Sequence, residues 1–101
     1  MVIRDYATIV RGRKIGDVFL FALSTCVWCM KTKKLLNNLG IEYSYIDVDL
    51  VEDDIKDEVV KELNRWNPSE SFPAIVINNK KHIIGYNVDE IEELGKCTRR
   101  K

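Results

Sequence analysis

Two cysteines separated by two residues, in Cys26-Val27-Trp28-Cys29, are the residues of this chain best suited to chemistry. They follow an apolar run and precede an amphipathic pattern, which predicts that Cys26 lies in the first turn of a helix. Backbone N–H groups without helical partners and the positive end of the helix dipole lie there, and both stabilise an anionic sulfur. The thiolate is the reactive form of cysteine. We therefore predict thiol–disulfide chemistry, with Cys26 as the nucleophile and Cys29 as the resolving thiol.

The elements around the two cysteines follow from hydrophobic patterning. Residues 17–23 are almost continuously apolar, which is typical of a strand buried on both faces. Ser24 and Thr25 offer side chains that could cap the following helix, which is expected to run to about Leu39 and to end at Gly40. The remaining elements are expected in the order strand 41–48, helix 51–66, strand 73–77, strand 80–84 and helix 88–94, the last ended by Gly95.

The order β-α-β-α-β-β-α predicts an α/β domain with a four-stranded mixed sheet flanked by about three helices. The domain is expected over residues 17–95. Residues 1–16 form an N-terminal extension, read as a short added strand or an extended arm, and residues 96–101 form a basic tail.

The bulk composition of the chain excludes several classes of function. The chain has 101 residues with 16 Lys and Arg against 16 Asp and Glu, so no net charge favours nucleic acid or an anionic membrane. No signal peptide and no membrane-spanning run is recognisable. Three cysteines do not make a secreted disulfide framework. We therefore expect a monomer in the reducing cytoplasm, where a disulfide would be catalytic and transient.

Four pieces of the sequence together resemble the glutaredoxins and glutaredoxin-like redoxins of the thioredoxin-fold superfamily. A Cys-x-x-Cys helix after the first strand and a late Phe-Pro before a hairpin carry the resemblance, which covers residues 17 to about 94. The matching pieces are Phe19–Cys29, Tyr45–Asp49, Ser71–Asn78 and Ile84–Tyr86.

The resemblance implies a substrate site beside the cysteines. It implies a cis peptide bond before Pro73, which lies against the active-site sulfurs in this family, and a backbone at Phe72 that pairs with an extended substrate. Gly85 and Tyr86 are expected in the same site. Trp28 is either a contact for the partner or a side chain that covers the helix. No metal or organic cofactor is required by this chemistry.

The chain departs from the glutaredoxin pattern where that family binds glutathione. The lysine usually found three positions before the first cysteine is Leu23 here, and the usual Gly-Gly-Cys-Asp is Ile84-Gly85-Tyr86-Asn87. Gly85-Tyr86 is closer to redoxins that serve ribonucleotide reductase and take electrons from thioredoxin reductase. We therefore expect protein disulfides as substrates and a thioredoxin-reductase-type flavoprotein as the reducing partner. A glutathione-dependent glutaredoxin is the first alternative.

A metal or iron–sulfur carrier is the alternative from a different class. A structural zinc site takes four Cys or His ligands, and only His82 and Cys97 remain beside the Cys-x-x-Cys pair. Redox chemistry is therefore favoured. Lys31, Lys33 and Lys34 could favour the thiolate or an acidic partner, although a solvated helix face is the simpler interpretation.

Overall fold

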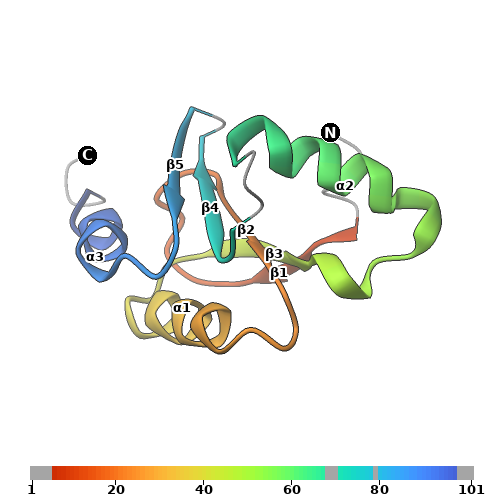
Figure 1. Cartoon of the computed structure of the whole chain (residues 1–101). Coiled ribbons are helices and arrows are strands. Elements are labelled where there is room, and N and C mark those ends of the chain that lie inside the picture. Colours follow the sequence, from red (N-terminus) through yellow and green to blue (C-terminus); the bar gives the residue numbers. More distant parts are fainter. Residues whose placement is uncertain (1–5, 68–70, 79, 98–101) are drawn as a thin grey trace.

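A computed structural model describes residues 6–67, 71–78 and 80–97 of the chain. Its centre is a five-stranded sheet in the order β1-β3-β2-β4-β5, covered by three α-helices (Figure 1). Within these residues no helix is both long and apolar enough to cross a membrane. The elements are β1 (Thr8–Val10), β2 (Val18–Ala22), α1 (Val27–Asn38), β3 (Tyr43–Asp47), the 3-10 helix η2 (Val48–Leu50), α2 (Asp53–Trp66), β4 (Ala74–Ile77), β5 (Lys81–Ile84) and α3 (Val88–Cys97).

The sheet has five strands, so the predicted number of four was wrong. The additional strand is β1, which comes from the predicted N-terminal extension and pairs antiparallel with β3, with Thr8 opposite Tyr45 and Val10 opposite Tyr43. Without β1, the outer edge of β3 would expose a row of unpaired N–H and C=O groups. The three residues of β1 cover part of that edge. This part of the predicted extension is therefore a strand of the sheet.

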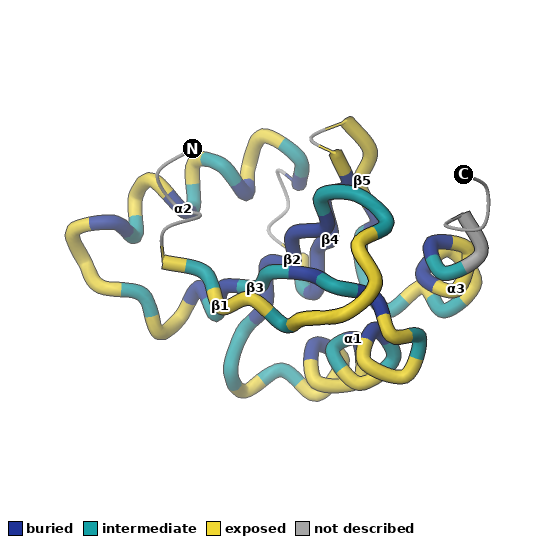
Figure 2. Tube along the Cα trace, turned by 180° about the vertical axis from the view of Figure 1, so that it is seen from behind, coloured by how far each residue is buried: buried dark blue, intermediate teal, exposed yellow. Residues whose placement is uncertain are grey.

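Strand β2 lies in the middle of the sheet, parallel to β3 and antiparallel to β4. All five of its residues are buried, because alternate side chains enter two separate cores. Val18, Leu20 and Ala22 pack with residues of α1 and α3, whereas Phe19 and Phe21 pack with residues of α2. Figure 2 shows this buried centre between half-exposed helices. The continuous apolar run of β2 is therefore explained by helices on both faces of the sheet.

The ends of α1 and α3 were both predicted from a glycine, and only the first of the two predictions is confirmed. Helix α1 ends as predicted, with Leu39 as its C-cap and Gly40 at φ +70°, a conformation that favours glycine. Helix α3 instead continues through Gly95 to Cys97, so the predicted stop at Gly95 was wrong. A Cβ atom added at Gly95 would lie 3.4 Å from the side chain of Leu39. Gly95 therefore lies where α3 packs beside the end of α1, and it does not change the direction of the backbone.

Candidate active site

Cys26 is the N-cap residue of α1, at the point where the loop after β2 turns into the helix. Its backbone is extended (φ −88°, ψ 116°), and its Sγ accepts a hydrogen bond of 3.1 Å from the backbone N–H of Cys29. Ser24 and Thr25, predicted as capping residues, precede this position. The sulfur itself therefore takes the place that a hydroxyl or carboxylate oxygen usually occupies at a helix N-terminus.

Cys29 lies in the core behind Cys26. Its relative exposure is 0%, whereas Cys26 is half-buried, and both cysteines are free thiols in this structure. The pKa of the Cys29 thiol is raised to about 12, mainly by burial and in addition by the hydrogen bond and the charge of Cys26. A backbone hydrogen bond at Leu23 and the charge of Lys33 act in the opposite direction. Cys29 therefore holds its proton at neutral pH.

The loop before Cys26 is held by a carboxylate that sequence analysis missed. Asp49 of η2 accepts two hydrogen bonds from Ser24, one from its backbone N–H at 2.9 Å and one from its hydroxyl at 2.6 Å. The hydroxyl bond is the main reason why the pKa of Asp49 is lowered. Because β2 and β3 are parallel, their carboxyl ends lie at one edge of the sheet. An acidic residue just after the second predicted strand was the signal for this contact.

The three lysines after the cysteines have different surroundings. Lys33 turns towards the sheet, where its Nζ lies 3.2 Å from Asp47 Oδ1 and 4.0 Å from the centre of the Tyr45 ring. Lys31 and Lys34 are exposed on the opposite side of α1. A single solvated face for all three lysines, the simpler interpretation of the sequence, is therefore wrong for Lys33.

The loop before β4 carries the predicted proline. The Phe72–Pro73 peptide bond is cis, Pro73 is buried, and Phe72 packs partly buried against the core. The carbonyl oxygen of Pro73 accepts a hydrogen bond of 2.7 Å from the backbone N–H of Gly85, which has φ +84°. This bond joins the Phe72–Pro73 loop to the loop after β5, where Tyr86 follows.

Four of the predicted substrate-binding residues line one hollow. Trp28, Phe72, Gly85 and Tyr86 surround a cavity of about 280 Å³. The Trp28 and Tyr86 rings lie 5.6 Å apart between their centroids and are tilted by 32°, and Trp28 is 54% exposed. Cys26, Phe72 and Tyr86 all pack against the same core cluster. The fold thus brings residues from three distant segments together beside the first turn of α1.

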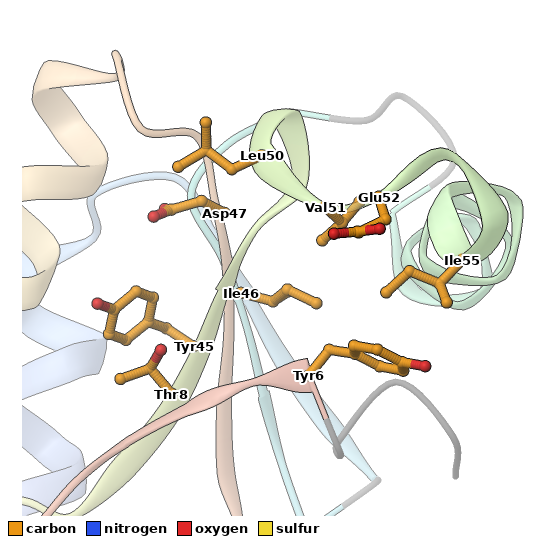
Figure 3. A pocket seen from close by; sticks show the side chains of 9 residues that line it. All are labelled: Tyr6, Thr8, Tyr45, Ile46, Asp47, Leu50, Val51, Glu52 and Ile55. Atoms are coloured by element: carbon orange, nitrogen blue, oxygen red, sulfur yellow. The ribbon is translucent and has the colours of Figure 1, made fainter.

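A second hollow, of about 260 Å³, lies between β1, β3 and the start of α2 (Figure 3). Tyr6 and Ile55 close it on one side, and Tyr45 and Thr8 line the other. It contains neither cysteine and none of the four residues that surround the hollow at Trp28 and Tyr86. We therefore treat it as separate from the candidate active site. Among the residues described, no group of three or more His, Cys, Asp or Glu side chains gathers as a metal site.

Comparison with known proteins identifies the relatives of this arrangement. The sequence profile of the glutaredoxin family matches residues 18–83, which include both cysteines and the hairpin. The chain belongs to the glutaredoxin family. It is a glutaredoxin-like redox protein, as the resemblance implied.

Solved structures support the same assignment at the level of the fold. The structure of the glutaredoxin from Methanosarcina mazei Go1 is 48% identical, with a TM-score of 0.81 over 88% of this chain and 87% of that one. The methanoredoxin of Methanosarcina acetivorans is 44% identical, with a TM-score of 0.79 over 82% and 87%. An uncharacterized glutaredoxin-like 8.6 kDa protein in a rubredoxin operon of Clostridium pasteurianum is 33% identical over 74% of this chain and 92% of its own length. The domain is therefore a thioredoxin fold of the glutaredoxin type.

Proposed function

We propose that the chain is a thiol–disulfide oxidoreductase that reduces protein disulfides, with Cys26 as the nucleophile and Cys29 as the resolving thiol. The observation that carries the proposal is the difference between the two sulfurs. Cys26 Sγ is half-exposed at a helix N-terminus and accepts the Cys29 N–H, whereas Cys29 is fully buried. N–H donors and the helix dipole stabilise negative charge on a sulfur at such a position.

In the first step the Cys26 thiolate attacks one sulfur of a disulfide in the partner. The Cys26 Sγ–S bond forms, the partner's S–S bond breaks, and the leaving thiolate takes a proton from solvent. In the second step Cys29 loses its proton and attacks Cys26 Sγ. The mixed disulfide breaks, a second thiolate leaves, and a Cys26–Cys29 disulfide remains. Two electrons have then moved from the dithiol to the partner.

The surroundings of Cys29 support this order of events. Two of the causes that raise its pKa are the hydrogen bond and the charge of Cys26. Both are lost once Cys26 is bonded to the partner, because the sulfur of a disulfide carries no negative charge. The positive charge of Lys33, which favours the Cys29 thiolate, stays in place. Formation of the mixed disulfide thus lowers the cost of ionising Cys29 when its attack is required.

The hollow beside Cys26 supports a partner held in an extended conformation. Phe72 and Pro73 lie at the start of β4, and Gly85 keeps the neighbouring loop against them through the hydrogen bond to Pro73. We assign Phe72, Pro73, Gly85 and Tyr86 to substrate binding, with Trp28 as an exposed aromatic contact. Backbone pairing at Phe72 would align a disulfide without demanding one particular side chain.

We further propose re-reduction by a thioredoxin-reductase-type flavoprotein in the cytoplasm, with the chain acting as a monomer. Leu23, at the position of the glutathione-contacting lysine, packs partly buried against the core cluster around α2 and offers no charge to a carboxylate. Arg65 and Lys61 are the two cations considered as replacements for this lysine, and Arg65 is paired with Glu62 at 3.1 Å. A charge-assisted hydrogen bond contributes about 1.5–3 kcal/mol, so its absence disfavours a glutathione clamp.

Reduction of insulin disulfides in the presence of dithiothreitol tests the oxidoreductase proposal. We expect the chain to accelerate the reaction, Cys26→Ser to abolish the acceleration, and Cys97→Ser to retain it as a control for the loss of one thiol. Equal activity of Cys26→Ser and the unchanged chain would refute the assignment of the nucleophile.

The electron donor requires a separate experiment. The protein is oxidised, the Cys26–Cys29 bridge is established by mass, and either glutathione or NADPH with thioredoxin reductase is added. Alkylation and mass spectrometry measure the loss of the bridge over time. We expect fast loss with the reductase and slow loss with glutathione. Fast reduction by glutathione alone would mean a glutathione-dependent glutaredoxin.

A further inference from the structure

A third hollow, of about 300 Å³, adjoins the candidate active site along α1. It contains two lysines, one aromatic residue and no carboxylate, and its lining residues are Lys31, Lys34, Leu35, Asn38 and Tyr86. Tyr86 also lines the hollow with Trp28, Phe72 and Gly85. The two hollows therefore share Tyr86, and we call their joint lining the aromatic–basic surface.

Lys31 links the two halves of the aromatic–basic surface. Its Nζ lies 5.0 Å from the centre of the Trp28 ring, within the range of a cation–π interaction. Among the residues that the structure describes, Lys33 pairs with Asp47, whereas neither Lys31 nor Lys34 forms an ion pair. Two lysines without a carboxylate partner among the described residues therefore lie beside the exposed Trp28 ring and the partly buried Tyr86 ring.

The charge changes sign across Tyr86. On the side towards α3, a further hollow is lined by Tyr86, Asn87 and Asp89, together with Ile84 and Val88. Because the whole chain has no net charge, attraction of a partner must come from such local differences. A partner that crosses the surface meets positive charge at α1 and negative charge at α3, which gives its segment a preferred direction.

We propose that the aromatic–basic surface selects disulfides in acidic segments of a partner protein. An apolar side chain next to the disulfide packs against Trp28 and Tyr86, while a carboxylate farther along the segment contacts Lys31 or Lys34. The inference rests on the proposed function, because it names the substrate class of the same site.

The geometry of a helix sets where the carboxylate must lie. Lys31 and Lys34 follow Cys26 by five and eight residues, which corresponds to roughly 7–12 Å along the axis of α1 at 1.5 Å per residue. An extended segment advances about 3.3 Å per residue. The acidic residue is therefore expected about two to four positions from the partner's cysteine.

Three disulfide-linked peptides with acidic, neutral or basic residues at those positions test the proposal. They carry glutamate, glutamine or lysine, and they are added in excess to the pre-reduced full chain, so that no electron donor is needed. We measure the rate of loss of protein thiols against peptide concentration. At low salt the glutamate peptide is expected to half-saturate at about tenfold lower concentration than the lysine peptide, with a similar limiting rate. Salt at about 1 M should remove the preference, because the charges are exposed.

Charge variants locate the effect. Lys31→Glu with Lys34→Glu should reverse the order of the peptides, and Lys31→Gln with Lys34→Gln should remove it. Lys80→Glu with Lys81→Glu is the matched control, since it changes the net charge equally at the β4–β5 hairpin, and it should keep the preference. Circular dichroism verifies that each variant is folded.

The outcomes separate the two proposals. Equal reduction of all three peptides, or an equal effect of the control pair, overturns the acidic-substrate inference and leaves the oxidoreductase intact. Failure to reduce even the glutamine peptide overturns the proposed function, and the inference with it.

Discussion

The outward and inward faces of α1 differ in the exposure and in the chemical type of their side chains. The outward face carries Val27, Trp28 and Met30, each more than half exposed, and the lysines of the aromatic–basic surface. The inward face carries Cys29, Thr32 and Leu36, each with 0% exposure. Cys29, Thr32 and Leu36 follow one another at spacings of three and four residues, so they share one face of the helix. Cys26 lies outside this stripe because it is the N-cap residue and its backbone is extended. A Cys-x-x-Cys pair at a helix N-terminus thus gives one accessible and one protected sulfur.

The largest expected effect concerns the reactivity of the two thiols. With limiting iodoacetamide near pH 7.5, Cys26 should be alkylated at least about a hundredfold faster than Cys29, because Cys29 is buried and its pKa is about 12. Peptide mapping by mass spectrometry measures both rates in the same sample. Similar rates at the two sulfurs would contradict the distinction between the faces.

The dependence of stability on pH tests the burial of Cys29 on the inward face of α1. Because the pKa of Cys29 rises from an ordinary value of 9.0 to about 12, the unfolded chain loses this proton first as the pH increases. The titration of Cys29 therefore leaves stability unchanged below pH 9 and lowers it between pH 9 and 12, by at most about 1.4 kcal/mol per pH unit. Urea unfolding under reducing conditions at pH 8 and pH 10.5 measures the change.

Cys29→Ala is the matched control for this titration. Tyr43, whose pKa is also raised to about 12 by burial, is present in both proteins and contributes to both pH profiles. The variant should therefore lose less stability between the two pH values than the unchanged chain. Parallel pH profiles would show that Cys29 is not held as a buried neutral thiol.

A smaller effect is expected at Thr32. Its hydroxyl donates a hydrogen bond of 2.8 Å to the carbonyl oxygen of Trp28 from the buried side of α1. Thr32→Val keeps the shape and removes this bond, so it should lower the free energy of unfolding by about 1 kcal/mol. The outward substitution Lys34→Gln should change stability by less than about 0.5 kcal/mol. Equal losses of unfolding free energy from both variants would mean that the two faces of α1 contribute equally to stability.

The smallest expected effect concerns the loop that leads to Cys26. The lowered pKa of Asp49 means that its contribution to stability is present above pH 3.8 and is lost as the pH falls further. Asp49→Asn should reduce this acid dependence, measured by thermal unfolding between pH 2.5 and 5. Ser24→Ala should do the same, and the double variant should add little because both changes remove the same contacts. Fully additive effects would mean that Ser24 and Asp49 act independently.

The family and most of the fold could be predicted from the sequence because its signals are local. The apolar run of β2, the Cys-x-x-Cys helix and the glycine after α1 each depend on neighbouring residues. The antiparallel position of β1 could not be predicted, because it depends on pairing with β3 some thirty-five residues later. The continuation of α3 through Gly95 could not be predicted either, because a glycine within a helix and a glycine that ends one look alike in the sequence.

In the candidate site, too, some contacts could be predicted from the sequence and others could not. Trp28, Phe72, Gly85 and Tyr86 were predicted through the resemblance and line one hollow. The bonds from Ser24 to Asp49 and the pairing of Lys33 with Asp47 were missed. They join the loop after β2 and helix α1 to the end of β3 and to η2, and the sequence does not specify how these elements lie relative to one another. The different environments of Lys31, Lys33 and Lys34 follow from their directions around α1, which became clear only with the sheet in place.

Trapping of the mixed disulfide tests the central claim most directly. Cys29→Ser and Cys26→Ser are each reduced, mixed with a disulfide-bearing protein in excess, quenched with acid and analysed by mass under non-reducing conditions. We predict that Cys29→Ser accumulates a covalent complex through Cys26 and that Cys26→Ser forms none, because Cys29 stays buried and protonated. A complex through Cys29, or none with either variant, would contradict it.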